Sequence, residues 1–348
     1  MEEFSPALCH LCGKESILVS AFLGVCGECI QNDFPRALPF LKTAHRIARK
    51  YLGMPPAPPG GKPICALCGN RCGKGGKSFC GLIEEGRRLA GTARKGLLEW
   101  YYDPLPSNCV ASFVCPEKRP GRENLAVFYG GCNFSCLFCQ NWHHHSLLEQ
   151  KIPLTSVEDL EKAVHGKVAC LCFFGGDPIP QIPHALALAR RLKDRLRICW
   201  ETNGAAHPRI LKEMFQLSLE SGGILKFDLK AFDERLHFAL TGVSNRLTLR
   251  NFSWAAKKAR DYPQVTVVAS TLLVPGYITP EEVEKIAAFI ASQNPEIPYA
   301  LLGFAPNFFL TDLPPTSTSH AEEALRRAQK QGLKNLHLGN PFLLSRAY

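Results

Sequence analysis

Short apolar runs alternate with stretches of helical character from about residue 124 onward. Runs of five to seven mainly apolar residues are typical of strands buried on both faces, as in a parallel sheet covered by helices. The chain is therefore predicted to have an α/β fold, and six strand–helix units indicate a partial (β/α)6 barrel. The expected strands are residues 125–129, 168–174, 196–200, 224–229, 265–270 and 299–304.

The ends of several helices can be placed from small polar residues and glycines. Thr155, Thr279 and Ser319 each stand three residues before a glutamate, which is the pattern of a capping box and predicts a helix start. Gly166 and Gly332 are expected to follow helix ends, because glycine readily adopts the left-handed conformation found there.

The first 53 residues contain two pairs of cysteines followed by an amphipathic helix. Each pair has the Cys-x2-Cys spacing of a metal-binding knuckle, and thirteen residues separate the pairs. Two such turns can face each other and complete a tetrahedral four-thiolate site, so residues 1–53 are predicted to hold a zinc-ribbon-like module. Rubredoxin-like iron has the same geometry and stays an alternative. The expected ligands are Cys9, Cys12, Cys26 and Cys29.

Apolar residues at helical spacing predict the amphipathic helix over residues 38–53, with its end at Gly53. Its basic residues lie off the apolar face and are expected in solvent: Lys42, Arg46, Arg49 and Lys50. Residues 54–63, MPPAPPGGKP, cannot continue a helix and lack the donors for a sheet, which predicts a stiff linker.

A second cysteine-rich region is expected over residues 64–123. A glycine-rich segment here can fold tightly around a metal site, and both a zinc knuckle and an auxiliary [4Fe–4S] cluster satisfy the ligand rules. Cys109 and Cys115 could replace a ligand, but buried free thiols are the commoner outcome. Cys170 and Cys172, on an expected strand, are predicted to pack as small hydrophobic residues. The expected ligands of this second site are Cys65, Cys68, Cys72 and Cys80.

Sixteen cysteines in 348 residues are the strongest signal in the composition. The chain begins MEEFSPALCH, without the features of a leader, and no apolar run reaches the roughly 18 residues needed to cross a bilayer. These features predict a cytoplasmic protein with no membrane partner, in which grouped cysteines bind metals. The net charge of +10 is dispersed along the chain, so nucleic acid is not indicated, and an acidic protein or a phosphorylated substrate would fit equally well.

Residues 130–142, GGCNFSCLFCQNW, place three cysteines within eight residues. A [4Fe–4S] cube has four irons, so three thiolates from one loop leave one iron open to a reactant. Phe138 could shield such a cluster from water and influence its potential. In the alternative, the three thiols and a residue such as His143 bind zinc. The expected ligands in both cases are Cys132, Cys136 and Cys139.

This loop resembles the signature of the radical S-adenosylmethionine (SAM) enzymes, Cys-x3-Cys-x-aromatic-Cys. FFGGD, at the end of the second expected strand, is similar to that family's Gly-Gly-acid motif. ETNG after the third strand, with DLK, TGVSNRLTLRNF and LLVPG, resembles the pyruvate formate-lyase-activating enzymes in particular. The resemblance covers about residues 124–305, and the second cysteine-rich region followed by this loop looks like the AmmeMemoRadiSam group.

The resemblance implies a radical SAM core over residues 124–348, with a [4Fe–4S] cluster and SAM as cofactors. It implies that Asp177 meets the ammonium of the methionine moiety and that Lys230 complements its carboxylate. In the activating enzymes the positions of Thr202 and Asp228 also help to hold a monovalent cation. In this chain Glu201 stands where those enzymes usually have Asp, so the resemblance does not settle whether the cation site is present. Ligands of parallel α/β barrels bind at the carboxyl ends of the strands, where most of these residues are expected. The implied cofactor-binding residues are Phe138, Gly175, Gly176, Asp177, Thr202, Asn203, Asp228 and Lys230.

By this resemblance the reduced cluster cleaves SAM to methionine and a 5′-deoxyadenosyl radical, which removes a hydrogen atom from a substrate. No protein acid or base need be catalytic, and a low-potential electron donor such as ferredoxin or flavodoxin is an expected partner. We expect an activase-like or protein-modifying enzyme. The alternatives are a radical SAM enzyme that modifies RNA or a small metabolite, and a non-catalytic zinc-binding protein.

Overall fold

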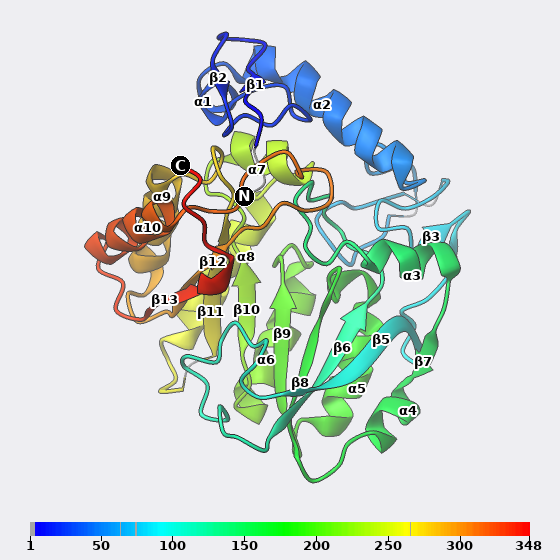
Figure 1. Ribbon diagram of the computed structural model, residues 1–348. Coiled ribbons are helices and arrows are strands. Elements are labelled where there is room, and N and C mark those ends of the chain that lie inside the picture. Colours follow the sequence, from blue (N-terminus) through cyan, green and yellow to red (C-terminus); the bar gives the residue numbers. More distant parts are fainter. Residues whose placement is uncertain (1–3, 63, 74, 265) are drawn as a thin grey trace.

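The computed structural model of the chain describes residues 4–62, 64–73, 75–264 and 266–348. Four parts of the predictions lie outside the described residues: residues 1–3 of the first module, Pro63 of the linker, Lys74 of the second cysteine-rich region and Val265 of a strand. A large α/β body carries a smaller N-terminal unit above one end of its sheet (Figure 1).

Nine strands form one sheet in the order β13-β12-β11-β10-β9-β8-β6-β5-β7 (Figure 1). Every neighbouring pair from β6 to β13 is parallel, whereas β5 is antiparallel to both β6 and β7. In the described part of the chain the outermost strands β13 and β7 do not pair, so the barrel is partial and open. The strands are β5 (Lys95–Pro104), β6 (Glu123–Tyr129), β7 (Leu154–Ser156), β8 (Val168–Gly175), β9 (Arg197–Thr202), β10 (Leu225–Asp228), β11 (Val267–Leu273), β12 (Tyr299–Gly303) and β13 (Leu336–Gly339).

The six predicted strands are present as β6, β8, β9, β10, β11 and β12, which confirms the α/β partial barrel. The structure adds a seventh parallel strand, β13, whose four residues are too short a pattern to stand out. It also adds β5, whose exposed stretch 99–102 interrupts any apolar run. Because β5 pairs with β6, the sheet extends across the predicted boundary at residue 123, and the domain limits otherwise stay predictions.

The parallel strands use their two faces differently. Side chains that point outward are apolar and belong to the main core shared with the helices, as do Val127, Phe173 and Phe227. Side chains that alternate with them point inward and line a cavity, as do Cys172 and Lys226. Since successive side chains of a strand point to opposite faces, one run of residues supplies both the core and the candidate site.

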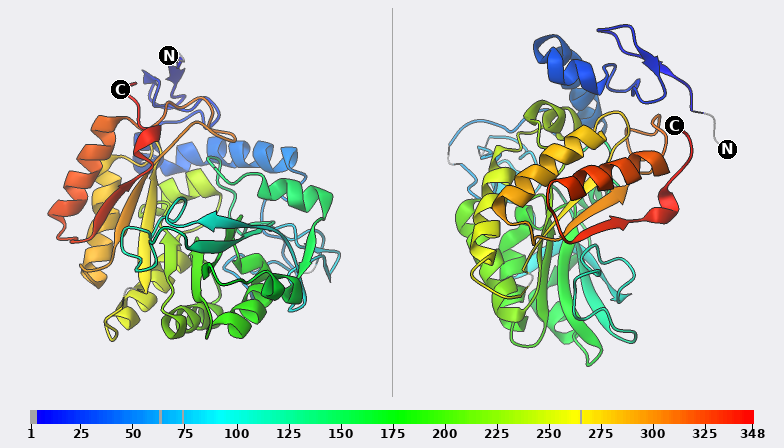
Figure 2. Two further views of the ribbon diagram at one scale, coloured as in Figure 1. Left: turned by 60° about the horizontal axis from the view of Figure 1, so that its bottom comes forward. Right: turned by 90° about the vertical axis from the view of Figure 1, so that its left-hand side faces the viewer.

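Most helices lie on the outer side of the sheet (Figure 2). Their apolar faces cover the outward-pointing strand side chains. None of the described helices is both long enough and apolar enough to cross a membrane. The helices of the body are α3 (His144–Gln150), α4 (Val157–Lys162), α5 (Ile182–Leu192), α6 (Pro208–Ser221), α7 (Glu234–Thr241), α8 (Arg246–Ala259), α9 (Pro280–Gln293) and α10 (Thr318–Lys330), with single 3-10 turns at Ile179–Gln181 and Pro341–Leu343.

The starts of these helices follow the predicted chemistry but not always the predicted residue. Thr279 caps α9 as expected, since its side chain accepts a hydrogen bond from a backbone N–H of the first turn. The predictions at Thr155 and Ser319 are wrong by one and two residues, because Ser156 caps α4 and Ser317 caps α10. Each cap lies within a run of hydroxyl residues, any of which can supply the oxygen.

Glycines follow two of the predicted helix ends. Gly332 has a φ of 89° just beyond α10, and Gly53 has a φ of 60° just beyond α2 (Phe34–Tyr51). The prediction for Gly166 is wrong, because α4 already ends at Lys162.

The N-terminal unit comprises β1 (Ala7–Leu8), β2 (Glu15–Ser16), α1 (Gly27–Asn32) and α2, which begins four residues before the predicted helix. It lies over the carboxyl ends of the parallel strands (Figures 1 and 2). The loop after β11 anchors it: a Cβ added to Gly276 would lie 2.0 Å from the carbonyl oxygen of Leu18. The Tyr277 hydroxyl donates to the carbonyl of Val25 at 3.0 Å and accepts from the amide of Ser20 at 3.0 Å.

The segment between α2 and β5 is mostly loop, with one small hairpin of β3 (Ile83–Glu84) and β4 (Arg87–Arg88). It folds back on the body. The amide of Gly69 donates to Ala205 O at 3.0 Å, and the amide of His207 donates to Leu67 O at 2.9 Å. The second cysteine-rich region therefore packs beside the loop that follows β9.

Replacing Gly276 with alanine should loosen the N-terminal unit. The new Cβ would displace the Leu18 carbonyl, and an L-residue at a φ of 75° is itself strained by about 1–2 kcal/mol. We expect Gly276→Ala to lower the unfolding temperature and to make residues 1–53 sensitive to limited proteolysis. Gly332→Ala is the matched control, since Gly332 has a φ of 89° but no atom within 4 Å of the added Cβ. Equal effects of the two substitutions would contradict the anchoring role.

Candidate functional site

A cavity of about 740 Å³ lies inside the barrel and reaches the carboxyl ends of its strands. Eight of the sixteen cysteines line it. The structure also brings together in its wall every residue predicted for the radical SAM site: Cys132, Cys136, Cys139, Phe138, Gly175, Gly176, Asp177, Thr202, Asn203, Asp228 and Lys230.

The cysteine loop, residues 130–142, follows β6 and is held by backbone bonds to neighbouring segments. The amide of Ser135 donates to Thr241 O at 2.9 Å, and that of Leu137 donates to Leu240 O at 3.0 Å. On the other side, the amide of Phe309 donates to Leu137 O at 3.0 Å. The end of α7 and the segment after β12 therefore position the three thiols together.

The three thiols of this loop are partly buried in the cavity wall, and their ligation of a metal stays a prediction. Burial raises the pKa of Cys136 to about 12 and that of Cys139 to about 11, so each thiol keeps its proton unless a cation stabilises the thiolate. Among the described residues, only the four N-terminal cysteines bring three or more ligand atoms within 4.8 Å of one another. The loop thiols are spaced too widely for one ion, which suits a cluster with several irons.

The zinc alternative through His143 finds no support in the geometry. The His143 ring stacks on Phe128 at a centroid distance of 4.1 Å. Of the three consecutive histidines, only His144 and His145 are among the described residues that line the cavity.

Gly175 and Gly176 allow the end of β8 to pack closely against the end of β6 and the start of the cysteine loop. A Cβ on Gly175 would lie 2.5 Å from Tyr129 N, and one on Gly176 would lie 2.2 Å from Gly131 O. Backbone bonds close the contact: Gly176 N donates to Tyr129 O at 3.0 Å, and Asp177 N donates to Gly131 O at 3.2 Å. The glycines are thus required for backbone packing, and their contact with SAM stays a prediction.

The carboxylate of Asp177 is buried and joins the ends of two strands. It accepts hydrogen bonds from the Thr202 hydroxyl at 3.0 Å, from Asn203 N at 2.8 Å and from Ile179 N at 2.8 Å. Burial raises its pKa to about 7, although these donors act in the opposite direction. The observed role of Asp177 is to hold the ETNG segment, and its contact with an ammonium group stays a prediction.

The ETNG segment is held from its other side by α8. The Thr248 hydroxyl donates to Asn203 O at 2.7 Å, and the Asn251 side chain donates to Gly204 O at 2.7 Å. Asn203 in turn donates to the side-chain oxygen of Asn133, in the cysteine loop, at 2.7 Å. Thr248 and Asn251 of the TGVSNRLTLRNF motif therefore hold the cavity wall in place but do not themselves line the cavity.

A network of charges follows the inner face of β10. Lys226 pairs with Glu201 at 3.2 Å and with Asp228 at 2.8 Å, and Lys230 pairs with Asp228 at 3.2 Å. Burial alone would raise the pKa of Asp228, but the two ammonium groups lower it below its ordinary value. The carboxylates at the implied cation position are thus already neutralised by lysine. Sequence analysis missed Lys226, although its i, i+2 spacing from Asp228 was a usable signal.

Lys230 carries positive charge toward the cysteine loop. Its ammonium lies 5.6 Å from the centroid of the buried Phe138 ring. Burial acts to lower the pKa of Lys230, but Asp228 and the nearby Cys136 thiolate raise it above its ordinary value. The side chain can therefore bind an anionic group beside these thiols.

Arg49 does not lie in solvent, as predicted for the basic face of its helix, but is only 2% exposed. Its guanidinium carbon lies 3.5 Å from the centroid of the Phe79 ring, and the group donates to the carbonyls of Phe79, at 2.7 Å, and Pro55. Burial lowers its pKa to about 10, while thiolates at Cys80, Cys132 and Cys72 favour its charged form. A buried cation of this kind requires a nearby anion.

The second cysteine set can supply that anion. Cys72 packs with Phe79 and Phe134 against Cys132 and Cys136, so the two predicted metal sites adjoin. Burial raises the pKa of Cys68 and Cys72, and neighbouring thiolates raise it further. Metal binding at Cys65, Cys68, Cys72 and Cys80 would fix negative charge beside Arg49, and this site stays a prediction with its metal open.

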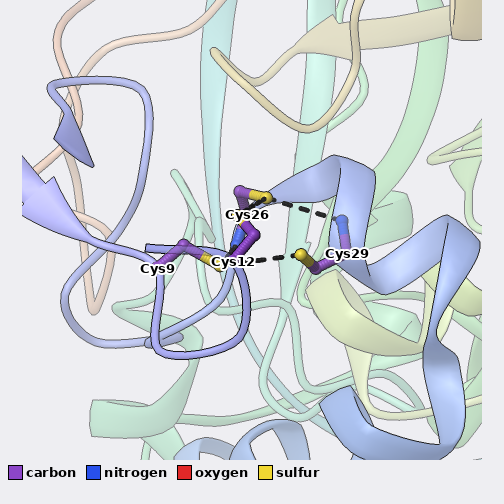
Figure 3. A group of neighbouring side chains, drawn as sticks. All are labelled: Cys9, Cys12, Cys26 and Cys29. Atoms are coloured by element: carbon purple, nitrogen blue, oxygen red, sulfur yellow. Dashed lines mark hydrogen bonds between the residues drawn. The ribbon is translucent and has the colours of Figure 1, made fainter. Parts of the chain in front are cut away.

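The four N-terminal cysteines converge between the turn that follows β1, which carries Cys9 and Cys12, and the start of α1, which carries Cys26 and Cys29 (Figure 3). The sulfurs of Cys9 and Cys29 lie 3.8 Å apart, and those of Cys12 and Cys26 lie 3.9 Å apart. A tetrahedral ion with metal–sulfur bonds of about 2.3 Å separates its ligands by about 3.8 Å. The predicted ligand group is therefore assembled for one ion, and both zinc and iron satisfy this geometry.

Residues 126–290 match the radical SAM superfamily. Over 185 residues the chain is 33% identical to a Methanocaldococcus jannaschii protein provisionally named a glycyl-radical enzyme activating enzyme, a match that covers 52% of this chain and 68% of that protein. An uncharacterized protein of the same organism is 24% identical over 294 residues, covering 80% of this chain and 81% of the relative. The pyruvate formate-lyase 1-activating enzyme of Escherichia coli K12 is 29% identical over 164 residues, covering 43% and 61% of the two chains.

Arg49→Met should weaken metal binding at the second cysteine set, since it removes the cation that favours thiolates there. We expect less iron or zinc per chain after anaerobic reconstitution and desalting. Arg46→Met is the matched control, because Arg46 is exposed on the same helix. An unchanged metal content in Arg49→Met would contradict the electrostatic role of Arg49.

Proposed function

Because this chain belongs to the radical SAM superfamily, we propose that it is an activase-like enzyme, which removes a hydrogen atom from a glycine residue of a partner protein. Members of this superfamily use a [4Fe–4S] cluster and SAM, and we assign the cluster to Cys132, Cys136 and Cys139. One observation carries this assignment: the residues predicted to bind the cluster and SAM line a single cavity.

Each part of the cavity wall has a proposed task. The three thiolates would hold the cluster, which would supply an open iron site for SAM. Lys230 complements the SAM carboxylate, and Asp177 keeps Thr202 and Asn203 in place beside the cluster. Phe138, buried next to the thiols, excludes water.

When bound, the reduced cluster and SAM supply the 5′-deoxyadenosyl radical that abstracts hydrogen. The chain itself contributes binding, orientation and exclusion of solvent. No acid or base of the chain is required, so we assign none.

Two observations support a protein as substrate. The first relative, the Methanocaldococcus protein, is named for activating a glycyl-radical enzyme, and the Escherichia coli relative is named for activating pyruvate formate-lyase. In addition, two exposed aromatic side chains that suit an apolar peptide segment, Tyr101 and Phe342, line the cavity.

The electron that reduces the cluster must come from a donor of low potential. Ferredoxins and flavodoxins remain the proposed donors, and a chain of net charge +10 suits an acidic partner of this kind. Family membership decides against the alternative of a non-catalytic zinc-binding protein. Modification of RNA or of a small metabolite remains an outcome of the substrate test.

Reconstituted anaerobically and reduced with dithionite, the protein should convert SAM to 5′-deoxyadenosine, measured by liquid chromatography and mass spectrometry. Cys136→Ala should lower the rate by at least about 100-fold, because it removes one of three cluster ligands. Arg46→Met changes a residue remote from the cavity and serves as the control for losses during purification and reconstitution. Product formation that survives in Cys136→Ala would refute the assignment of the loop.

The substrate class can be identified by tracing the hydrogen atom that is transferred from the substrate to 5′-deoxyadenosine. Source cells are grown on glycine deuterated at its α-carbon, and their extract is divided into protein, RNA and small-molecule fractions. We expect deuterium in 5′-deoxyadenosine only with the protein fraction, and its loss after protease treatment. Stimulation of the reaction by the RNA or small-molecule fraction alone would contradict an activase and favour the corresponding alternative.

A further inference from the structure

Five cysteines outside the predicted sites meet at the end of the cavity away from the cysteine loop. The two N-terminal groups and the loop take eleven of the sixteen cysteines, and the remaining five all line the cavity. They come from three segments far apart in the sequence: Cys109 and Cys115 after β5, Cys170 and Cys172 on β8, and Cys199 on β9.

Strand register places Cys170 near the amino end of β8 and sets Cys172 and Cys199 side by side near the middle of their strands. Cys170 pairs with Asn124, near the start of β6, and its thiol lies 3.5 Å from the Asn124 side-chain oxygen. Cys172 pairs with Cys199 across the β8–β9 ladder. The loop that follows β5 begins beside the start of β6, since Pro104 pairs with Glu123, so it closes this end of the barrel.

Packing distinguishes four of these five cysteines from the fifth. One small apolar cluster contains Cys170, and Cys109 and Cys199 both contact it. A second cluster contains Ala111, and it is contacted by Cys109, Cys115 and Cys199. Cys172 belongs to neither cluster, although the β8–β9 ladder sets it opposite Cys199. The loop and the strands therefore direct Cys109, Cys115, Cys170 and Cys199 toward one place.

Neighbouring charges are consistent with a shared anionic group. Burial raises the pKa of the Cys170 thiol, and thiolates at Cys199, Cys109 and Cys115 raise it further, which reflects their proximity. Arg197, at the start of β9, acts in the opposite direction on Cys199. Arg197 itself is paired with Glu117 at 3.3 Å.

We propose that Cys109, Cys115, Cys170 and Cys199 bind an additional iron–sulfur cluster at the amino end of the barrel. Four thiolates are the usual ligand set of such clusters. Among the described residues these thiols, like those of the cysteine loop, do not gather three sulfurs within 4.8 Å, which disfavours a single ion. They are free cysteines, and three of the four are only partly buried.

This proposal revises the expectation that Cys170 packs as a small hydrophobic residue and that Cys109 and Cys115 are unused thiols. It does not rest on the proposed activase function, because the cluster can be detected without any substrate.

The first test uses the unaltered full-length chain. Anaerobically reconstituted protein and protein stripped of iron by a chelator are treated with iodoacetamide, and alkylation of each cysteine is measured by peptide mass spectrometry. We expect iron to reduce alkylation of the four thiols at least about tenfold, because a thiolate bound to iron is a poor nucleophile. Alkylation that does not depend on iron, a disulfide among these residues, or protection by zinc alone would overturn the proposal.

The second test compares variants. A double variant that combines Cys109→Ser with Cys199→Ser should contain fewer irons per chain than the unaltered protein. The loss should be about two irons if the cluster is [2Fe–2S] and about four if it is [4Fe–4S], with an equal loss of sulfide. Cys172→Ser is the matched control, a thiol in the same wall that should keep the iron content of the unaltered protein. Both should retain the change in the electron paramagnetic resonance spectrum that SAM causes at the Cys132 loop cluster, as a sign of an intact fold. Equal iron in both would overturn the proposal, and if the double variant fails to fold, the alkylation test decides.

Discussion

Successive side chains of the parallel strands point to opposite faces of the sheet, and this alternation separates the core from the cavity. On β8, Leu171 and Phe173 point outward into the core that the helices cover, while Cys170 and Cys172 point inward to the cavity. Burial of the outward side chains stabilises the sheet, at about 25 cal/mol per Å² of apolar surface. The inward face therefore does not need to be uniformly apolar, and it can carry thiols and paired charges.

The cavity wall is positioned by backbone contacts before any cofactor is considered. Gly176 permits a contact with the cysteine loop that no other residue could make, and Asp177 ties this strand end to Thr202 and Asn203. Two side chains of α8, Thr248 and Asn251, hold the same segment from behind. Such supporting contacts keep ligand groups in place, which lowers the cost of binding a cluster and a small molecule.

Most of the candidate site could be anticipated because the carboxyl ends of parallel strands meet at one edge, so residues that follow successive strands become neighbours. The interactions that could not be anticipated are those between residues far apart in the sequence, because no local pattern predicts them. Lys226 acts as a counter-ion because the register sets it between Glu201 and Asp228. Arg49 is buried because the second cysteine region folds back over its helix. These interactions depend on segments that packing alone brings together.

By itself the sequence determined the α/β class, six of the seven parallel strands, the three-cysteine loop and the residues that follow the strands, since these depend on short-range spacing and on the ordering of strands. Only the tertiary structure decided which face each strand presents and which hydroxyl caps a helix. In the run 316–319, Thr316 is engaged in a buried bond to the Leu273 carbonyl, so Ser317 caps α10. Likewise, a cysteine in an apolar run looks like any other core residue until strand register brings Cys170 and Cys199 beside the thiols of a distant loop.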